Sequence, residues 1–158
     1  MQNVFAEEPA PLQQFINSLD FEWLRHRART VRGTECTIRT DIFSAGQDNI
    51  AYEISFSDSV RCVARIALPP FSTSVMPFSH REAAEIQSEI SAIEYVSAHT
   101  TIPVPKIYDY NVEKTNQLGA PYILMKAIKG RFVEHLCRIL EKYSRHVYML
   151  KSPGLSSS

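Results

Sequence analysis

Two neighbouring segments, residues 50–56 and 62–68, constrain the fold more than any other part of this chain. In the first, large apolar residues alternate with small or polar ones, which is the two-residue period of a half-buried strand. The second is apolar apart from Arg65, and the Ser-Asp-Ser sequence at 57–59 has the composition of a tight turn. The pattern predicts a β-hairpin, and with it a sheet, in the middle of the chain.

A short loop that contains Gly46, residues 44–49, precedes this hairpin. The backbone N–H groups of such a loop and the Arg65 cation on the return strand can both face an anion such as phosphate. The same residues also fit an ordinary turn followed by a strand with one solvated arginine. On these residues alone, both interpretations stay open.

Length and charge limit the classes of protein to which the chain can belong. Its 158 residues suit a single domain, and 17 basic side chains balance 17 acidic ones, so no surplus charge attracts nucleic acid or an anionic membrane. No apolar run approaches the ~20 residues of a membrane-spanning helix, and the N-terminus has no signal-peptide pattern. We therefore expect a cytoplasmic protein without nucleic-acid or membrane partners.

The three cysteines, Cys36, Cys62 and Cys137, are far apart in the sequence. Their spacing matches neither a disulfide framework nor a zinc site. We interpret them as ordinary thiols in a reducing compartment, and we predict no metal-binding residues.

Two further segments have helical periodicity. In the N-terminal extension, residues 1–32, the apolar spacing predicts an amphipathic helix over 12–29. The basic end of this helix either binds an anion or, in the simpler interpretation, forms a solvated last turn. The Ser-His-Arg-Glu sequence at 79–82 is a capping box, which predicts the start of a second helix that runs to about residue 98.

The remaining strands follow from prolines and apolar runs. Residues 34–42 predict a strand before the hairpin, and three prolines within 69–78 predict a loop. The prolines of segment 103–108 impose an extended entry into a short strand, and the apolar run 121–125 predicts a buried one. The order of helix, three strands, helix and two strands predicts an α+β fold, a five-stranded antiparallel sheet with one helix packed on it.

Five short motifs in the chain occur in the same order as in a known enzyme family. They are N-x-x-Y-E-I (49–54), V-A-R-I (63–66), S-E-I-S-A-I (88–93), T-x-I-P-V-P-K-I-Y (100–108) and P-Y-I-L-M (121–125), with Gly130 after them. On these motifs, residues 33–130 resemble the N-terminal lobe of the aminoglycoside phosphotransferase (phosphotransferase enzyme) family, and most closely its fungal-type branch. The resemblance implies a protein-kinase-like fold and the nucleotide-binding half of an ATP-dependent small-molecule kinase.

The resemblance assigns the ATP phosphates to four residues. Gly46 and Asn49 would belong to the loop over the phosphates. Arg65 would replace the strand lysine that meets the α- and β-phosphates, and Glu89 would be the helix acid paired with it. Arginine suits this role because its planar fork binds carboxylate or phosphate through two hydrogen bonds.

The resemblance assigns the adenine ring to five residues. Ala51 and Val63 would cover one face of the ring, and Met125 would close the back of the pocket. The carbonyl of Lys126 and the N–H of Ile128 would hydrogen-bond the edge of the ring.

The catalytic part of the family's pattern is absent from the sequence. In the family, the base and the Mg²⁺ ligands come from an H-x-D-x-x-x-x-N motif and a later Asp in a large C-terminal lobe, and no segment here matches them. We therefore expect a truncated chain without catalytic or metal-binding residues, which binds ATP weakly and does not phosphorylate the family's small-molecule hydroxyl substrates alone. The alternative is a non-catalytic interaction module or relic.

The C-terminal residues predict where such a module would bind a partner. Residues 131–150 predict an amphipathic helix at the start of the missing lobe, and 151–158 predict a disordered tail. An apolar helix face without a lobe to cover it is expected to self-associate or bind a partner. The residues of this face are Phe132, Leu136, Leu140, Tyr143 and Val147.

Overall fold

The computed structural model describes residues 10–46, 48–69, 72–73, 76–77 and 83–128. The chain divides into two compact units, Met1–Ala127 and Ile128–Ser158, and in the second unit only Ile128 is described. All helices and strands named below lie in the first unit.

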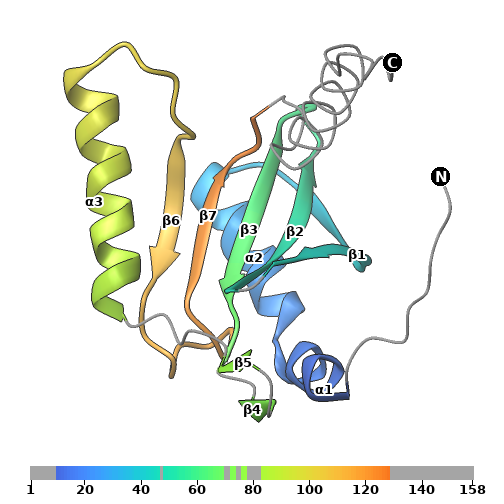
Figure 1. The fold of residues 1–158 in the computed structure, drawn as a ribbon. Coiled ribbons are helices and arrows are strands. Elements are labelled where there is room, and N and C mark those ends of the chain that lie inside the picture. The colour runs from blue at the N-terminus through green and yellow to red at the C-terminus, as the bar shows by residue number, and fades with distance from the viewer. Residues whose placement is uncertain (1–9, 47, 70–71, 74–75, 78–82, 129–158) are drawn as a thin grey trace, which may run out of the picture. The chain divides into compact units, whose positions relative to one another are not determined.

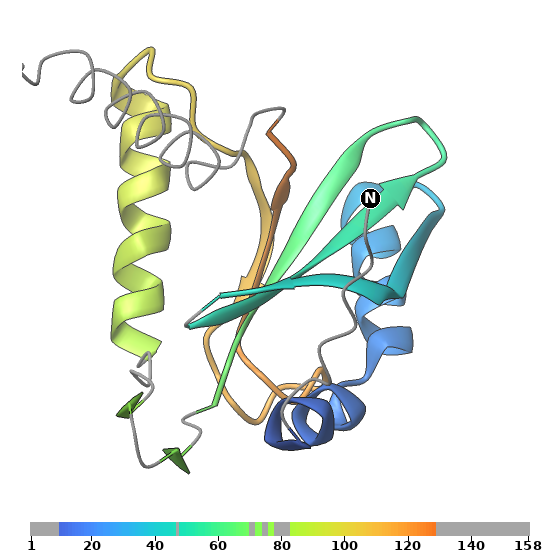
Figure 2. The same cartoon turned by 45° about the vertical axis from the view of Figure 1, so that its right-hand side comes forward.

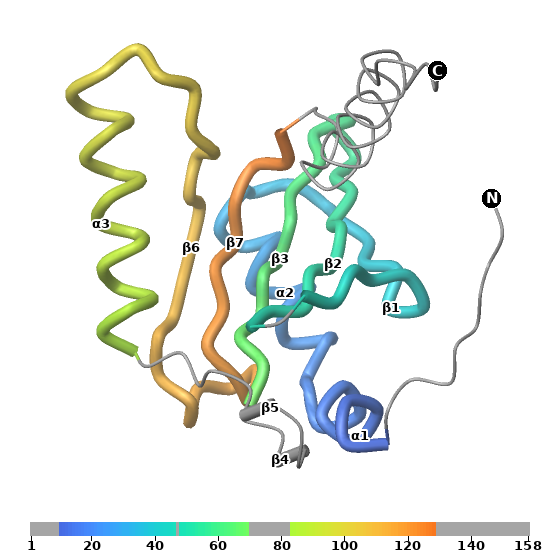
Figure 3. The backbone as a smooth tube through the Cα atoms, viewed as in Figure 1, coloured from blue at the N-terminus to red at the C-terminus, as the bar shows by residue number. Residues whose placement is uncertain are grey.

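A five-stranded antiparallel sheet forms the centre of the first unit (Figure 1). Its strands, in chain order, are β1 (Cys36–Ala45), β2 (Asn49–Phe56), β3 (Arg61–Ala67), β6 (Ile107–Asn111) and β7 (Tyr122–Lys126). They lie in the order β1-β2-β3-β7-β6, so β7 lies between β3 and the strand that precedes it in the chain (Figure 3). The predicted α+β class and the five-stranded antiparallel sheet are confirmed.

The β2–β3 hairpin has the alternation that the sequence predicts. The large apolar residues of β2 are buried, while the residues between them are half-buried or exposed. At the turn, the Asp58 carboxylate accepts a hydrogen bond from the Val60 N–H at 3.1 Å. The hairpin therefore has one buried face and one partly open face.

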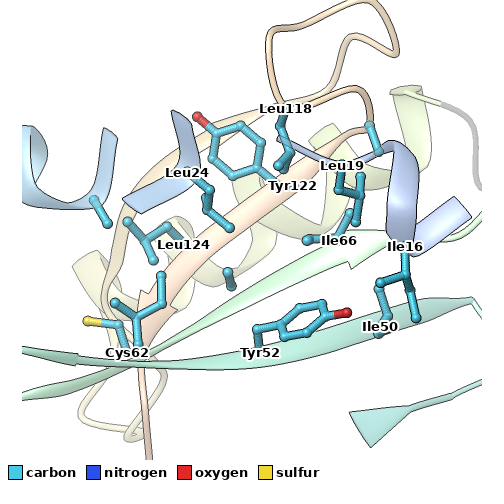
Figure 4. Close-up of a cluster of buried hydrophobic side chains, with 14 of the residues drawn as sticks. Ile16, Leu19, Leu24, Ile50, Tyr52, Cys62, Ile66, Leu118, Tyr122 and Leu124 are labelled. Carbon is cyan, nitrogen blue, oxygen red and sulfur yellow. The ribbon is translucent and has the colours of Figure 1, made fainter. Parts of the chain in front are cut away.

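Two helices, α1 (Ala10–Ser18) and α2 (Phe21–Arg32), cover the buried face of the sheet (Figure 2). The core between these helices and the sheet combines side chains from both helices, β2, β3, β7 and the loop before β7 (Figure 4). Its fully buried members include Leu24, Tyr52, Ile66, Leu118 and Leu124. Both helices thus share one core with the sheet, and the predicted boundary between segments 1–32 and 33–130 stays a prediction.

The prediction of a single helix over 12–29 is wrong, because the chain turns at Leu19 and Asp20. The Asp20 carboxylate accepts the Trp23 N–H at 2.8 Å and so caps the start of α2. The Asp20 N–H in turn donates to the Leu118 carbonyl at 3.1 Å. This second contact comes from a distant loop, which the local sequence pattern does not reveal.

The basic end of α2 is balanced by ion pairs. Each of its four arginines has a nitrogen within hydrogen-bond distance of a carboxylate oxygen. The pairs are Arg25–Glu22 at 2.8 Å, Arg27–Asp109 at 2.7 Å, Arg29–Glu35 at 2.8 Å and Arg32–Asp58 at 2.9 Å. The structure therefore favours a structural last turn over an anion site in this segment.

The third helix, α3 (Ala83–His99), lies on the other face of the sheet, alongside β6 (Figures 1 and 2). Its Ile86 and Ile90 are buried against side chains of β3 and β7, including Ile123. Farther along the helix, Val96 is only half-buried. Because the helix lies along the edge of the sheet, only its first half packs against the sheet's apolar side chains.

Several predictions from the sequence concern segments that the structure describes only in part or not at all. The capping box at 79–82, the helix at 131–150 with its five apolar residues, and the tail at 151–158 lie outside the described residues. Within the predicted loop at 69–78, two short strands pair, β4 (Ser72–Thr73) and β5 (Met76–Pro77). In the described part of the chain, no helix has the length and hydrophobicity to cross a membrane.

A mostly buried carboxylate joins α2 to β6 and β7. Arg27 donates from Nε and Nη2 to the two oxygens of Asp109 at 2.7 and 2.8 Å, and the Tyr122 hydroxyl donates to the same carboxylate at 2.7 Å. Burial alone would raise the pKa of Asp109, but the hydrogen bonds from Arg27 and Tyr122 outweigh it and hold that pKa below its usual value. Burial and the bond to Asp109 raise the pKa of Tyr122.

We expect Asp109→Asn to lower the free energy of unfolding by about 2 kcal/mol, because hydrogen bonds to a charged, mostly buried group are weakened. The matched control is Asp41→Asn, whose pair with Arg39 is exposed and is expected to leave the unfolding midpoint unchanged. Urea unfolding of both variants measures the difference. Equal effects would contradict a structural role for Asp109.

The effect of Asp109→Asn should also depend on pH. The pKa of Asp109 in the folded chain lies below the value of about 3.9 expected in the unfolded chain, so ionisation of Asp109 stabilises the fold above that pH. This stabilisation is lost as the pH falls through the folded pKa. The difference in the free energy of unfolding between the parent chain and Asp109→Asn should therefore stay constant down to about pH 5 and become smaller below about pH 4.

Candidate functional site

Five side chains of β2 and β3 share the sheet face that α3 covers only in part. We call them the β2–β3 surface: Asn49, Ala51, Glu53, Val63 and Arg65. They point away from the core under α1 and α2 because successive side chains of a strand point to opposite faces. Each is half-buried or exposed. Strand pairing places Ala51 directly across from Arg65, and Glu53 directly across from Val63.

An ion pair connects this surface to α3. The Nη2 atom of Arg65 donates to Oε1 of Glu89, and the two side chains are 27% and 25% exposed. Glu89 lies between Ile86 and Ile90, the two residues that bury α3 against the sheet. Packing of this turn of the helix therefore determines where the carboxylate lies. The contact that the sequence predicted between Arg65 and Glu89 is present, while their role in binding a nucleotide stays a prediction.

The Arg65 guanidinium has donors beyond its bond to Glu89. Its Nε is buried and has no hydrogen-bond partner among the described residues. A guanidinium carries five N–H donors, and a buried donor without a partner costs about 1–3 kcal/mol. Arg65 also lines a closely packed crevice with Asn49, Ala67, Ile86 and Ile123, which has no room for a water molecule. The pair with Glu89 thus fixes the position of the cation, while its unpartnered Nε lies buried and out of a ligand's reach.

One backbone hydrogen bond of Gly46 bears on the phosphate cradle that the sequence suggested. The Gly46 N–H donates to the Asn49 carbonyl at 2.8 Å, which closes a tight turn between β1 and β2. A Cβ at position 46 would meet only that same oxygen, at an ordinary contact distance of 3.7 Å. The structure therefore favours the ordinary-turn interpretation for Gly46, because its N–H is already bonded within the loop.

The residues assigned to the adenine ring lie together on the sheet. Ala51 and Val63 are diagonal neighbours on β2 and β3, and both are half-buried. Met125 lies directly across from Val63 and is buried beside α3. A flat ring would find small apolar side chains here next to the Arg65 cation.

The structure says less about the two residues assigned to the edge of the adenine ring. The Lys126 N–H donates to the Lys106 carbonyl at 2.8 Å, and the Lys126 side chain is exposed. Ile128 is 61% exposed and belongs to the second unit. Hydrogen bonds from these two residues to an adenine stay predictions.

The described residues do not gather into a metal site. Within the described ranges, no group of three or more His, Cys, Asp or Glu side chains is arranged to hold a metal ion. Cys36 and Cys62 are buried free thiols, and burial raises the pKa of each. A raised pKa disfavours the reactive thiolate, so both cysteines are best understood as core residues.

Among curated proteins, the chain is similar to three yeast proteins named Altered inheritance of mitochondria protein 9, mitochondrial. The identity is 28% over 85 residues in Debaryomyces hansenii, 31% over 85 residues in Meyerozyma guilliermondii and 25% over 88 residues in Candida dubliniensis. The matches cover 54–56% of this chain but only 12–13% of each relative, so the chain spans about an eighth of their length. No family model and no solved structure matches the chain.

These findings correct three expectations. The identification with aminoglycoside phosphotransferases is wrong, because the matching relatives carry a mitochondrial inheritance name and no family model or solved structure supports a kinase-like family. The expected kinase function is wrong for the same reason, and the interaction-module alternative gains no support. The cytoplasmic location is also wrong, since the relatives are named as mitochondrial. The buried residues of these motifs pack within the sheet or against α3, and such packing does not by itself specify a reaction.

Sequence reasoning missed one charged residue of the β2–β3 surface. Glu53 is 52% exposed and lies across from Val63, with an oxygen 3.5 Å from a nitrogen of Arg61. The signal was available, since Glu53 is two positions from Ala51 and strand alternation puts both on one face. The N-x-x-Y-E-I motif includes Glu53, but the resemblance assigns it no role.

We expect Glu89→Gln to loosen α3, because the substitution removes the charge that pairs with Arg65 and keeps the side chain's volume. A half-exposed pair of this kind contributes about 1 kcal/mol, which corresponds to roughly fivefold faster amide exchange. Hydrogen exchange of residues 86–92 measures the change. The matched control is Glu85→Gln, one turn earlier on the same helix and exposed. Equal exchange in the two variants would contradict a role for the ion pair in holding α3.

Proposed function

We propose that the β2–β3 surface binds an adenine nucleotide, in a protein that acts in mitochondria. The observation that supports binding is the half-buried pair of Arg65 and Glu89 beside the small residues Ala51 and Val63. The carboxylate holds the cation at one place on the sheet. The Arg65 side chain is 27% exposed and a guanidinium carries five N–H donors, so a phosphate oxygen can serve as a second acceptor.

The expected affinity is low. One face of an adenine ring is on the order of 100 Å², which gives about 2–3 kcal/mol at ~25 cal/mol per Å² of apolar area. A charge-assisted hydrogen bond from Arg65 adds about 1.5–3 kcal/mol, and ordering the ligand costs several. These gains come to about 3.5–6 kcal/mol before the ordering cost, so the dissociation constant is expected to be millimolar or weaker.

The proposal concerns binding and includes no transfer reaction. The finer assignment of the fold, as the nucleotide-binding half of a protein-kinase-like architecture, belongs to the proposal only as a statement about shape. It is supported by the pairing of a strand cation with a helix carboxylate across a five-stranded antiparallel sheet. A fold of this kind does not determine activity, which depends on the chemistry of the site.

The mitochondrial part of the proposal rests on the relatives. All three are named as mitochondrial and for altered inheritance of mitochondria. We infer the same compartment and process for this chain from similarity over slightly more than half of its length.

We expect adenosine and ATP, titrated to about ten times a millimolar dissociation constant, to shift the backbone NMR signals of Ala51 and Val63. Ala51→Leu should abolish these shifts, because the larger side chain occupies the place of the ring. Ser55→Leu, on the same strand and face but next to the turn, is the matched control and should keep them. Unchanged signals at positions 51 and 63 of the parent chain would refute adenine binding at this surface.

We also expect a fluorescent fusion of the full-length gene product to overlap with a mitochondrial marker in yeast cells. The fluorescent protein alone serves as the control and should remain diffuse. A diffuse signal from the fusion, equal to that of the control, would count against the mitochondrial part of the proposal.

A further inference from the structure

The four central residues of the β2–β3 surface form a rectangle with two distinct diagonals. Ala51 faces Arg65, and Glu53 faces Val63. One diagonal therefore joins the small apolar residues Ala51 and Val63, and the other joins the oppositely charged Glu53 and Arg65. Diagonal neighbours of an antiparallel pair lie about 7–8 Å apart, which is close to the length of a purine ring system and its substituents.

A flat ring that lies over Ala51 and Val63 has the charged groups of Arg65 and Glu53 on either side. Arg65 is half-buried and held by Glu89. Glu53 is exposed, and among the described residues its nearest cation is Arg61, at 3.5 Å with 55% of the Arg61 side chain exposed. Such an exposed, long ion pair contributes little, so the Glu53 carboxylate keeps its capacity to accept hydrogen bonds from a ligand.

We propose that Glu53 determines which ligand the surface prefers, by accepting a hydrogen bond from a neutral N–H or O–H donor of the nucleoside while Arg65 faces the phosphate. This inference rests on the proposed nucleotide binding and adds a residue that orients the ligand. A carboxylate attracts donors and repels phosphate. The phosphate therefore lies at the Arg65 end of the rectangle, and the donor lies at the Glu53 end.

Two groups of adenosine supply this donor chemistry, the exocyclic amine of the base and the hydroxyls of the ribose. Inosine lacks the amine, and 2′,3′-dideoxyadenosine lacks the ribose hydroxyls. Comparison of the three nucleosides on the parent chain identifies the donor. We expect the nucleoside that lacks it to bind roughly fivefold more weakly than adenosine, as for one hydrogen bond to a partly solvated carboxylate.

The decisive variant is Glu53→Ala, assayed by NMR titration of the full chain with the same three nucleosides. We expect it to bind adenosine roughly fivefold more weakly than the parent chain and to lose the preference among the nucleosides. Arg61→Ala is the matched control, because it removes the neighbour of Glu53 and leaves the carboxylate, so selectivity should persist. An unchanged thermal unfolding midpoint in Glu53→Ala excludes a loss of fold as the cause.

Two failures are distinguishable. If the parent chain binds adenosine at positions 51 and 63 but Glu53→Ala keeps the same relative affinities, the role of Glu53 is overturned and nucleotide binding stands. If adenosine and ATP leave both positions of the parent chain unperturbed, both proposals are overturned.

Discussion

The alternation of side chains along β2 and β3 is the constraint on which the rest of this structure depends. It places large apolar residues on one face, where α1 and α2 bury them, and leaves small and charged residues on the other. A shift of the pairing by one residue would exchange the two faces and expose the core. The position of Arg65 opposite Ala51 is thus fixed by the same register that buries Ile50 and Ile66.

The parts of the fold that depend on local sequence signals were predictable. The β2–β3 hairpin follows from a two-residue repeat, β6 and β7 from prolines and an apolar run, and α3 from the capping box before it. The break between α1 and α2 was not predictable, because Asp20 bonds to Leu118, almost a hundred positions away. The carboxylate between Arg27 and Tyr122 depends on a partner separated by 82 positions, and likewise leaves no local signature.

The contact at the candidate site was expected correctly, whereas the protein family assigned to the site was wrong. The resemblance implied contact between Arg65 and Glu89, and this contact is present. The family assignment used the same residues and was wrong. Motif residues such as Ile90, Ile123 and Met125 pack α3 on the sheet, and packing of this kind cannot specify a reaction. Chemistry depends on exposed groups such as Glu53, to which the motif comparison gave no role.

The attachment of α3 has a physical consequence for any ligand on the β2–β3 surface. A helix of 17 residues is marginally stable alone, so its position depends on tertiary contacts. Among the described residues these contacts include the burial of Ile86 and Ile90, each contributing about 1.5–3 kcal/mol, and the bond from Arg65 to Glu89. The ion pair adds about 1 kcal/mol to what holds the helix. A ligand that competes with Glu89 for the guanidinium would bind at the expense of that attachment. A ligand that accepts hydrogen bonds from the other donors of Arg65 would leave the attachment intact. Such a ligand is therefore expected to bind more tightly than an anion that displaces Glu89.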